Sequence, residues 1–158
     1  MTATPGRTFE QSILVEATPR ALYDLVSDIT RTGEWSPVCR ACWWDDAAEA
    51  GQVGAWFTGH NELADRTWET RSQITAAVPD REFAWIVGGR FARWGFTFDP
   101  DGTATKLTES WEFLPAGIAM FAKKYGDRAA AEIDERTRQA HRGIPQTLAA
   151  IKRIAEAS

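Results

Sequence analysis

The sequence predicts one α+β domain in which an antiparallel sheet is followed by a long C-terminal helix. Two observations lead to this fold class. Runs of alternating apolar and polar residues, separated by turn residues, fill positions 38–113 and are typical of consecutive antiparallel strands. From Asp127 almost to the C-terminus, apolar residues recur at the spacing of one helix face. The length of 158 residues fits a single domain over residues 1–158, and we find no repeat or linker.

A strand and a helix are predicted before these runs. Residues 8–16 alternate with a period of two and predict the first strand. Thr18 can cap the following helix, and Pro19 suits its first turn, where a missing N–H costs nothing. The apolar residues that follow at helical spacing are Leu22, Leu25, Val26 and Ile29. One face of this helix should therefore be buried.

A second short helix should precede six further strands. Asp28 or Thr30 can cap this helix, and it should end before Pro37, because the residue ahead of a proline is pushed out of the helical region. The predicted strands are 38–44, 53–63, 67–78, 82–87, 91–99 and 103–113, and the breaks between them are rich in Gly, Pro and Asp. Such breaks predict hairpins, so the sheet should hold about seven strands in a meander.

The C-terminal part has a different pattern. Residues 114–126 are apolar and predict a loop or a brief helix. The helical stripe beyond them consists of Ile133, Thr137, Ala140, Ile144, Leu148, Ile151 and Ala155. Pro145 interrupts this stripe together with Gly143. Proline inside a helix removes a backbone hydrogen bond, so we expect a bend near Gly143.

Composition and charge restrict the partners of the protein. The net charge is −4 and no block of basic residues occurs, so nucleic acid is not an expected partner. The N-terminus lacks the apolar region of a signal peptide, and no apolar run is long enough for a membrane span. A cytoplasmic location is therefore expected. The chain has eight tryptophans and eight phenylalanines, which favours a heavy core or an apolar cavity lined with rings.

Short motifs in a consistent order carry a resemblance to a known family over nearly the whole chain. They are Trp35-Ser36-Pro37, Gly54-Ala55-x-Phe57-x-Gly59-His60-Asn61, Trp68-Glu69-Thr70, Glu82-Phe83-Ala84-Trp85, Trp94-x-Phe96-x-Phe98, Leu107-Thr108-Glu109-Ser110-Trp111, and Gly143 with Thr147-Leu148. Together they resemble the START-like or SRPBCC superfamily, in particular its polyketide cyclase/dehydrase-like branch. The resemblance implies a helix-grip fold, with a curved sheet around the C-terminal helix and an apolar cavity between them. Members bind lipids, sterols, polyketides or hormones, and some are aromatases or cyclases.

Glu109 is the main candidate for chemistry. The odd positions of residues 105–113 place this carboxylate on one strand face with Leu107, Trp111 and Phe113. If this face lines the cavity, burial would raise the pKa of Glu109, and the group could move protons or anchor a ligand hydroxyl. The alternative is a carboxylate that pairs with an arginine or lies at a wet cavity mouth.

His60 is the second catalytic candidate, and Asn61 beside it is a candidate ligand contact. Neighbouring residues on a strand point to opposite faces, so only one of the two should face the cavity unless a bulge at Gly59 intervenes. We favour Asn61, together with Phe57. For His60, an exposed or structurally bonded ring is the alternative to a catalytic role.

These observations lead to two hypotheses for function. The first is binding or transport of a small hydrophobic or aromatic molecule between the sheet and the C-terminal helix, and the second is a cyclase, aromatase or dehydrase that uses Glu109 or His60 for proton transfer. The proposed ligand contacts are Phe57, Asn61, Trp68, Thr70, Ser72, Trp85, Trp94, Phe96, Glu109, Trp111, Ile144 and Leu148. No nucleophile motif, phosphate loop or dinucleotide fingerprint occurs. We expect no cofactor and no metal, and either a monomer or a homodimer.

Both cysteines of the chain lie in the stretch WSPVCRACWW. Cys39 and Cys42 fall on a predicted strand, where residues three positions apart face opposite sides with Cα atoms about 10 Å apart. This is beyond the reach of a disulfide, so the pattern argues against a redox or metal site unless a bulge brings the sulfurs together. Of Trp43 and Trp44, one should help to close the core or cavity and the other should lie outside it.

Overall fold

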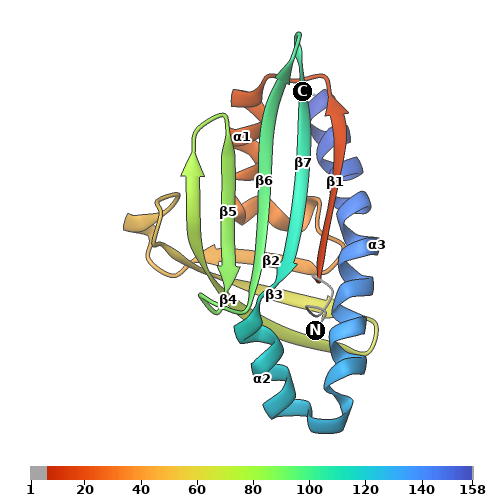
Figure 1. Cartoon of the computed structure of the whole chain (residues 1–158). Helices are drawn as coiled ribbons and strands as arrows, with labels where there is room; N and C mark the ends of the chain where they lie inside the picture. Colours follow the sequence, from red (N-terminus) through yellow and green to blue (C-terminus); the bar gives the residue numbers. More distant parts are fainter. Residues whose placement is uncertain (1–6, 158) are drawn as a thin grey trace.

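The computed structural model, which describes residues 7–157, confirms the predicted helix-grip fold (Figure 1). The strands are β1 (Thr8–Val15), β2 (Cys39–Trp44), β3 (Trp56–Leu63), β4 (Arg66–Val78), β5 (Glu82–Val87), β6 (Ala92–Asp101) and β7 (Ala104–Phe113). The helices are α1 (Pro19–Val26), α2 (Pro115–Tyr125) and α3 (Ala129–Glu156), with short 3₁₀ helices η1 (Ile29–Glu34), η2 (Ala47–Glu49) and η3 (Gly126–Arg128).

The seven strands form one antiparallel sheet in the order β1-β7-β6-β5-β4-β3-β2. Each strand from β2 to β6 pairs with the next one along the chain, and β1 pairs with β7. In Figure 1, β5, β6 and β7 run lengthwise beside α3, whereas β2 and β3 cross below them. Register shifts that mark bulges lie in β4, between Ile74 and Ala76, and in β2, between Cys39 and Ala41. Bulges increase local twist and bend a strand, which suits a sheet that curves around a helix.

The two N-terminal helices begin as their capping residues predict. The Thr18 hydroxyl accepts a hydrogen bond from the Ala21 N–H at 3.1 Å, and Pro19 occupies the first turn of α1. Asp28 rather than Thr30 caps η1, because its carboxylate accepts from the Thr30 N–H at 3.2 Å. Each cap satisfies a backbone donor that the helix itself leaves unpaired.

The C-terminal part contains two helices. Of the loop and the brief helix considered for residues 114–126, the structure shows a helix, α2, over Pro115–Tyr125. Pro115 lies in its first turn, and Phe121 packs edge-on against Phe113 with ring centroids 5.0 Å apart. α3 continues over 28 residues across Gly143 and Pro145. The helix is therefore uninterrupted there, and a bend at Gly143 stays a prediction.

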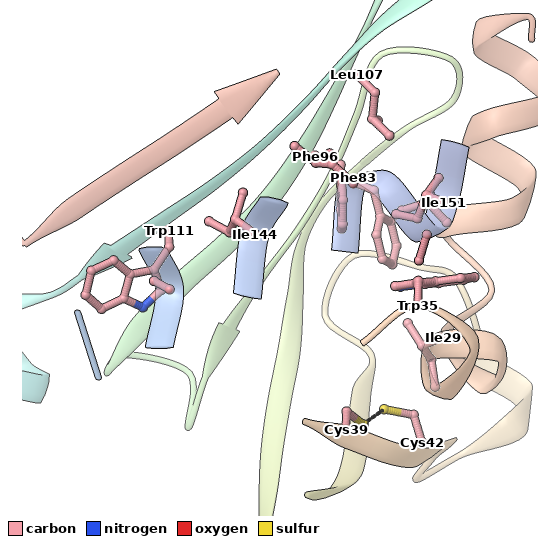
Figure 2. Packing of buried hydrophobic residues seen from close by; sticks show 14 of the residues in the cluster. Ile29, Trp35, Cys39, Cys42, Phe83, Phe96, Leu107, Trp111, Ile144 and Ile151 are labelled. Atoms are coloured by element: carbon pink, nitrogen blue, oxygen red, sulfur yellow. Dashed lines mark hydrogen bonds between the residues drawn. The ribbon is translucent and has the colours of Figure 1, made fainter. Parts of the chain in front are cut away.

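The core lies between α3 and the inner face of the sheet. Ile144, Leu148 and Ile151 of α3 are at most 1% exposed, as are Leu107 of β7 and Phe83 of β5. Figure 2 shows Ile144 and Ile151 of α3 on the same side of the sheet as Phe83 and Leu107. Burial of each such side chain stabilises the fold by about 1.5–3 kcal/mol, so this contact anchors α3 to the sheet. None of the helices within residues 7–157 has the length and apolar character that a membrane crossing requires.

Candidate functional site

A cavity of about 580 Å³ lies between the sheet, α2 and α3. Every strand except β1 contributes to its wall, and η1 closes one side. α3 packs on β1 and β7. The inner face of the other strands therefore borders the cavity. The volume falls within the range of about 300–1,000 Å³ typical of small-molecule sites.

The wall of the cavity is largely aromatic. Five of the eight tryptophans line it. The aromatic lining consists of Trp35, Phe57, Trp68, Trp85, Phe91, Trp94, Phe96, Trp111, Phe113, Phe121 and Tyr125. The rings also touch one another: Trp85 lies 5.9 Å from Phe57 and 6.1 Å from Phe96 between centroids, and Trp94 lies 6.3 Å from Trp111. Rings in contact restrict each other's orientation and form a rigid apolar surface.

Glu109 lies in this apolar wall. Its strand face is the one predicted, since Leu107, Trp111 and Phe113 are buried with it. The side chain is 5% exposed, and its Oε1 atom has no hydrogen-bond partner. Removal from water raises the pKa of Glu109 well above the usual range of a glutamate. The arginine partner considered as an alternative is absent from residues 7–157, so the group is held as a neutral acid at pH values where an exposed glutamate is charged.

α3 contributes four residues to the cavity wall that were not among the proposed ligand contacts. Arg136, Gln139, Gly143 and Thr147 line the cavity, and the Nε2 atom of Gln139 is buried without a hydrogen-bond partner. These residues are three or four positions apart, so they share one helix face. This face lies beside the apolar stripe, and spacing along the chain does not show which of the two faces borders the cavity.

Asn61 lies in the cavity wall as expected. It is buried, and its Nδ2 atom donates to the Thr70 hydroxyl at 3.3 Å and more weakly to the Gly59 carbonyl at 3.5 Å. These contacts orient the amide along the wall between β3 and β4. Its carbonyl oxygen can therefore accept a hydrogen bond from a molecule in the cavity.

His60 lies outside the cavity. Its side chain is 37% exposed, and Nδ1 is 3.8 Å from the Glu69 carboxylate. The alternation of β3 turns it to the outer face of the sheet, because Asn61 faces inward. The structure therefore agrees with the alternative to a catalytic role for His60, which was an exposed ring.

Ten of the twelve proposed ligand contacts line the cavity. They are Phe57, Asn61, Trp68, Thr70, Ser72, Trp85, Trp94, Phe96, Glu109 and Trp111. Ile144 and Leu148 do not line it, because their face of α3 packs into the core against the sheet. Gly143 and Thr147, one position earlier in each case, occupy the wall instead.

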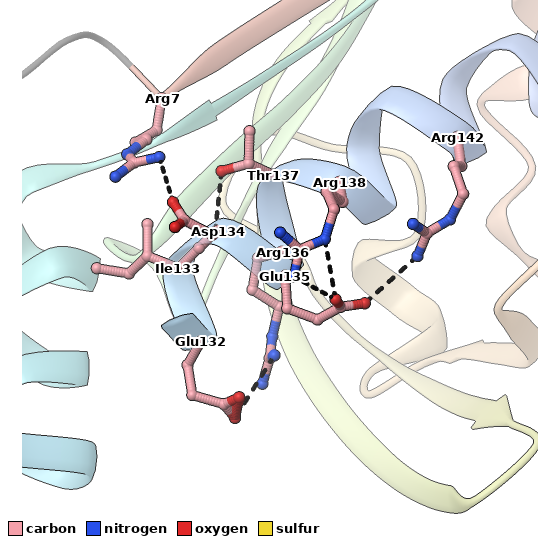
Figure 3. Close-up of polar contacts among 9 residues, drawn as sticks. All are labelled: Arg7, Glu132, Ile133, Asp134, Glu135, Arg136, Thr137, Arg138 and Arg142. Carbon is pink, nitrogen blue, oxygen red and sulfur yellow. Dashed lines mark hydrogen bonds and ion pairs between the residues drawn. The ribbon is translucent and has the colours of Figure 1, made fainter. Parts of the chain in front are cut away.

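The exposed lining residues mark the opening of the cavity. Lys124 at the end of α2 is exposed, and Arg136 of α3 lies nearby, half-buried, with its guanidinium 5.2 Å from the Phe121 ring centroid. Figure 3 shows Arg136 directed toward Glu132, at 3.9 Å. The same view shows Arg7 bound to Asp134 at 2.8 Å, which ties the start of β1 to α3. The helical side of the opening therefore carries one lysine, Lys124, and one arginine that pairs with a carboxylate, Arg136.

The prediction that Cys39 and Cys42 face opposite sides of β2 is wrong. The register of β2 shifts between Cys39 and Ala41, so Arg40 is the extra residue of a bulge. Arg40 and Ala41 both face solvent, and the two cysteines on either side of them are buried. Both are free thiols that line the cavity.

The bulge also decides which tryptophan of β2 faces inward. Trp44 packs edge-on against Phe57 with centroids 5.9 Å apart, and Trp43 is 42% exposed. One ring thus supports the core and the other lies outside it, as predicted. Within residues 7–157, no group of three or more His, Cys, Asp or Glu side chains is arranged to hold a metal ion.

Comparisons with known proteins agree with this architecture. A family model described as "Polyketide cyclase / dehydrase and lipid transport" matches residues 7–140. A polyketide-cyclase-like protein of Corynebacterium glutamicum, solved in solution, is 50% identical, with a TM-score of 0.72 over 98% of this chain and 94% of that one.

Two more distant structures share the fold. The ZhuI aromatase/cyclase of Streptomyces sp. R1128 is 19% identical, with a TM-score of 0.67 over 96% of this chain and 94% of that one. The two-domain aromatase/cyclase StfQ of the steffimycin pathway is 14% identical, with a TM-score of 0.69 over 96% of this chain and 51% of that one. A comparison with curated proteins gives no match.

Proposed function

Because this chain belongs to the polyketide cyclase/dehydrase and lipid transport family, we propose that it binds a small, largely aromatic or apolar molecule carrying a neutral hydroxyl or carbonyl group. One observation carries the proposal: an unpartnered buried carboxyl, Glu109, stands in an aromatic cavity of about 580 Å³. The apolar body of the ligand would lie on the tryptophan rings. Its polar group would meet Glu109.

The chemistry of Glu109 sets the kind of polar group. A neutral carboxylic acid can donate a hydrogen bond through its O–H and accept one at its other oxygen. It can therefore pair with a carbonyl or a hydroxyl. The unpartnered Nε2 atom of Gln139 adds a second donor on the facing helix. An anionic group at this depth would lose its hydration without gaining a charge partner, so a neutral group fits best.

The two unpaired polar atoms also supply selectivity. A molecule that leaves a buried donor or acceptor unpaired forfeits about 1–3 kcal/mol for each group. A purely apolar ligand would therefore bind more weakly than one with a correctly placed oxygen. Arg136 and Lys124 lie nearer the opening, where a second, charged end of a longer ligand could remain hydrated.

A second candidate function is proton transfer by Glu109 in a cyclase- or dehydrase-type reaction. The raised pKa of Glu109 favours it, because a carboxyl that is still protonated near neutral pH can act as a general acid. His60 takes no part in this version, since it lies on the outer face. Glu109→Gln keeps the shape and removes the ionisable proton. Turnover of a candidate substrate that survives this change would rule out the catalytic version and leave binding in place.

Mass spectrometry of the purified protein tests the binding proposal. The protein is purified without added ligand and extracted with organic solvent, and a co-purifying molecule with an aromatic or apolar body and an oxygen group is expected. A parallel titration uses aminoanthracene, a neutral aromatic fluorescent probe. Tight binding of the probe by the folded protein is expected, because the rings that line the cavity offer it a dry surface.

A cavity-filling variant shows where the probe binds. Ser72 is buried in the wall of β4, so Ser72→Phe would place a ring inside the cavity. We expect it to weaken probe binding by about tenfold or more, which corresponds to about 1.4 kcal/mol. Thr67→Phe is the matched control, since Thr67 is exposed on the outer face of the same strand. Equal affinities of both variants and wild type, together with an empty extract, would refute the proposal.

A further inference from the structure

The thiols of Cys39 and Cys42 meet in the wall of the cavity. Their Sγ atoms are 3.1 Å apart and share a hydrogen bond, as Figure 2 shows. Both residues are 8% exposed. A disulfide needs an S–S distance of about 2.05 Å. The two sulfurs would therefore have to move closer by about 1 Å to form a covalent bond.

Two features of the fold hold the thiols together. The bulge at Arg40 turns both cysteines to the inner face of β2. On the neighbouring strand, Gly59 faces the pair: a Cβ atom there would lie 3.3 Å from the Cys42 sulfur and 3.4 Å from the Cys39 sulfur. Both distances are close for atoms of this size, so a larger residue would press on the sulfurs. The absence of a side chain at Gly59 leaves room for the pair.

The cavity is the route by which a reagent reaches these thiols. Both cysteines line it, and both are shielded from the outside by β2 and η1. A small uncharged oxidant that enters the cavity therefore meets two adjacent sulfurs.

The two thiols are not equivalent. Hydrogen bonding from Cys39, helped by the hydroxyl of Thr32, lowers the pKa of Cys42, whereas the same hydrogen bond and burial raise the pKa of Cys39. Cys42 ionises first, and the thiolate is the form that attacks. The Cys39 thiol lies next to the Cys42 sulfur and would react with Cys42 once Cys42 has been oxidised.

We propose that Cys39 and Cys42 form a reversible disulfide when hydrogen peroxide enters the cavity. The Cys42 thiolate attacks one peroxide oxygen and breaks the O–O bond, which gives a sulfenic acid on Cys42 and a hydroxide that takes up a proton to become water. The Cys39 sulfur attacks the Cys42 sulfur, the S–S bond forms, and the hydroxyl leaves with the Cys39 proton as a second water. Two thiols are oxidised by two electrons in total, and one hydrogen peroxide is reduced to two waters. A dithiol reductant reverses the bond by thiol–disulfide exchange.

The test uses the full-length protein, reduced, desalted and kept folded at neutral pH. After treatment with a small excess of hydrogen peroxide, intact-mass spectrometry should show a monomer lighter by two hydrogen atoms. A thiol titration in denaturant should fall from two thiols per chain to none, and dithiothreitol should restore both. Near-ultraviolet circular dichroism recorded during the reaction shows that the fold is retained.

Single variants provide the matched controls. Cys39→Ser and Cys42→Ser each keep one thiol, so neither can lose two hydrogens, and we expect peroxide to add oxygen atoms to Cys42 in the first variant. The proposal is independent of the ligand, since no step of the test requires one. It would be overturned if the folded wild type kept both thiols under peroxide, gained oxygen on each cysteine separately, or formed a disulfide between two chains.

Discussion

Glu109→Gln gives the sharpest test of the burial of this carboxyl, because it predicts how stability depends on pH. The folded protein raises the pKa of Glu109 through desolvation, whereas a glutamate in the unfolded chain titrates at about 4.3. Between these two values the folded state keeps a proton that the unfolded state has lost. The unfolded chain then binds fewer protons, so stability falls as the pH rises.

The slope of this effect follows from linkage. In the window between the unfolded and folded pKa values, one retained proton lowers the free energy of unfolding by about 1.4 kcal/mol for each pH unit. Below the window Glu109 is protonated in both the folded and the unfolded state, so it no longer makes the free energy of unfolding depend on pH. Glu109→Gln removes the titration, so the stability of the variant relative to wild type should rise by about 1.4 kcal/mol per pH unit through the window.

The new amide adds a constant that does not depend on pH. Glu109 has no partner for Oε1. The neutral acid carries one O–H donor and a Gln amide carries two N–H donors, so the variant would leave one more buried donor unpaired, at a cost of about 1–3 kcal/mol. The variant should therefore be the less stable protein in acid and should approach or overtake wild type as the pH rises. This crossing of the two curves would be hard to explain by a loss of packing.

Urea unfolding monitored by tryptophan fluorescence, repeated at each pH from 4 to 8, measures the difference. The quantity of interest is how the difference in free energy of unfolding between wild type and variant changes with pH. The pH-independent cost of the amide cancels in this change. Glu112→Gln is the matched control, since Glu112 is exposed on the outer face of the same strand. A difference for Glu109→Gln that is flat across this range would show that Glu109 ionises like an exposed carboxyl, and the reasoning would fail.

Three further changes test the packing around the cavity. Ile144→Ala should lower the free energy of unfolding in urea by about 2–5 kcal/mol, because Ile144 is 1% exposed in the core. It should not weaken binding of aminoanthracene, because Ile144 lies outside the cavity wall. A parallel loss of affinity would contradict this placement. Thr18→Ala should cost about 1 kcal/mol by removing the 3.1 Å cap of α1, and Thr18→Ser should restore most of it; an Ala variant as stable as wild type would argue against the cap. Gly117→Ala would bring a Cβ into a clash with the Phe91 carbonyl oxygen, so α2 must shift at a cost of about 1–3 kcal/mol in thermal unfolding. An unchanged Tm would refute the close packing of α2.

The strands and their faces were predictable because period two is a local property of the chain. The inward set of β7, which contains Glu109, follows from alternation alone, and so does the choice of Asn61 over His60 in β3. The capping residues Thr18 and Asp28 likewise act on their own neighbours in sequence. The order of these elements, with its motifs, was enough to indicate the helix-grip fold.

Alternation failed where a bulge shifted the register. In β2 the extra residue Arg40 turned Cys39 and Cys42 to the same side, and no local feature of the sequence distinguishes this arrangement from a regular strand. The bulge depends on how β2 pairs with β3, which is a contact between distant parts of the chain. The meeting of the two sulfurs is therefore a product of tertiary structure.

The sequence by itself determined the architecture, the aromatic richness and the face on which Glu109 lies, because these depend on spacing along the chain. Only the tertiary structure decided which face of α3 borders the cavity, since the position of the helix on the curved sheet sets which of its faces meets the hollow. The stripe with Ile144 packs on the sheet, and the stripe with Gln139 faces the hollow. The position of α3 against the curved sheet also leaves Glu109 buried without a charge partner. Its removal from water raises its pKa.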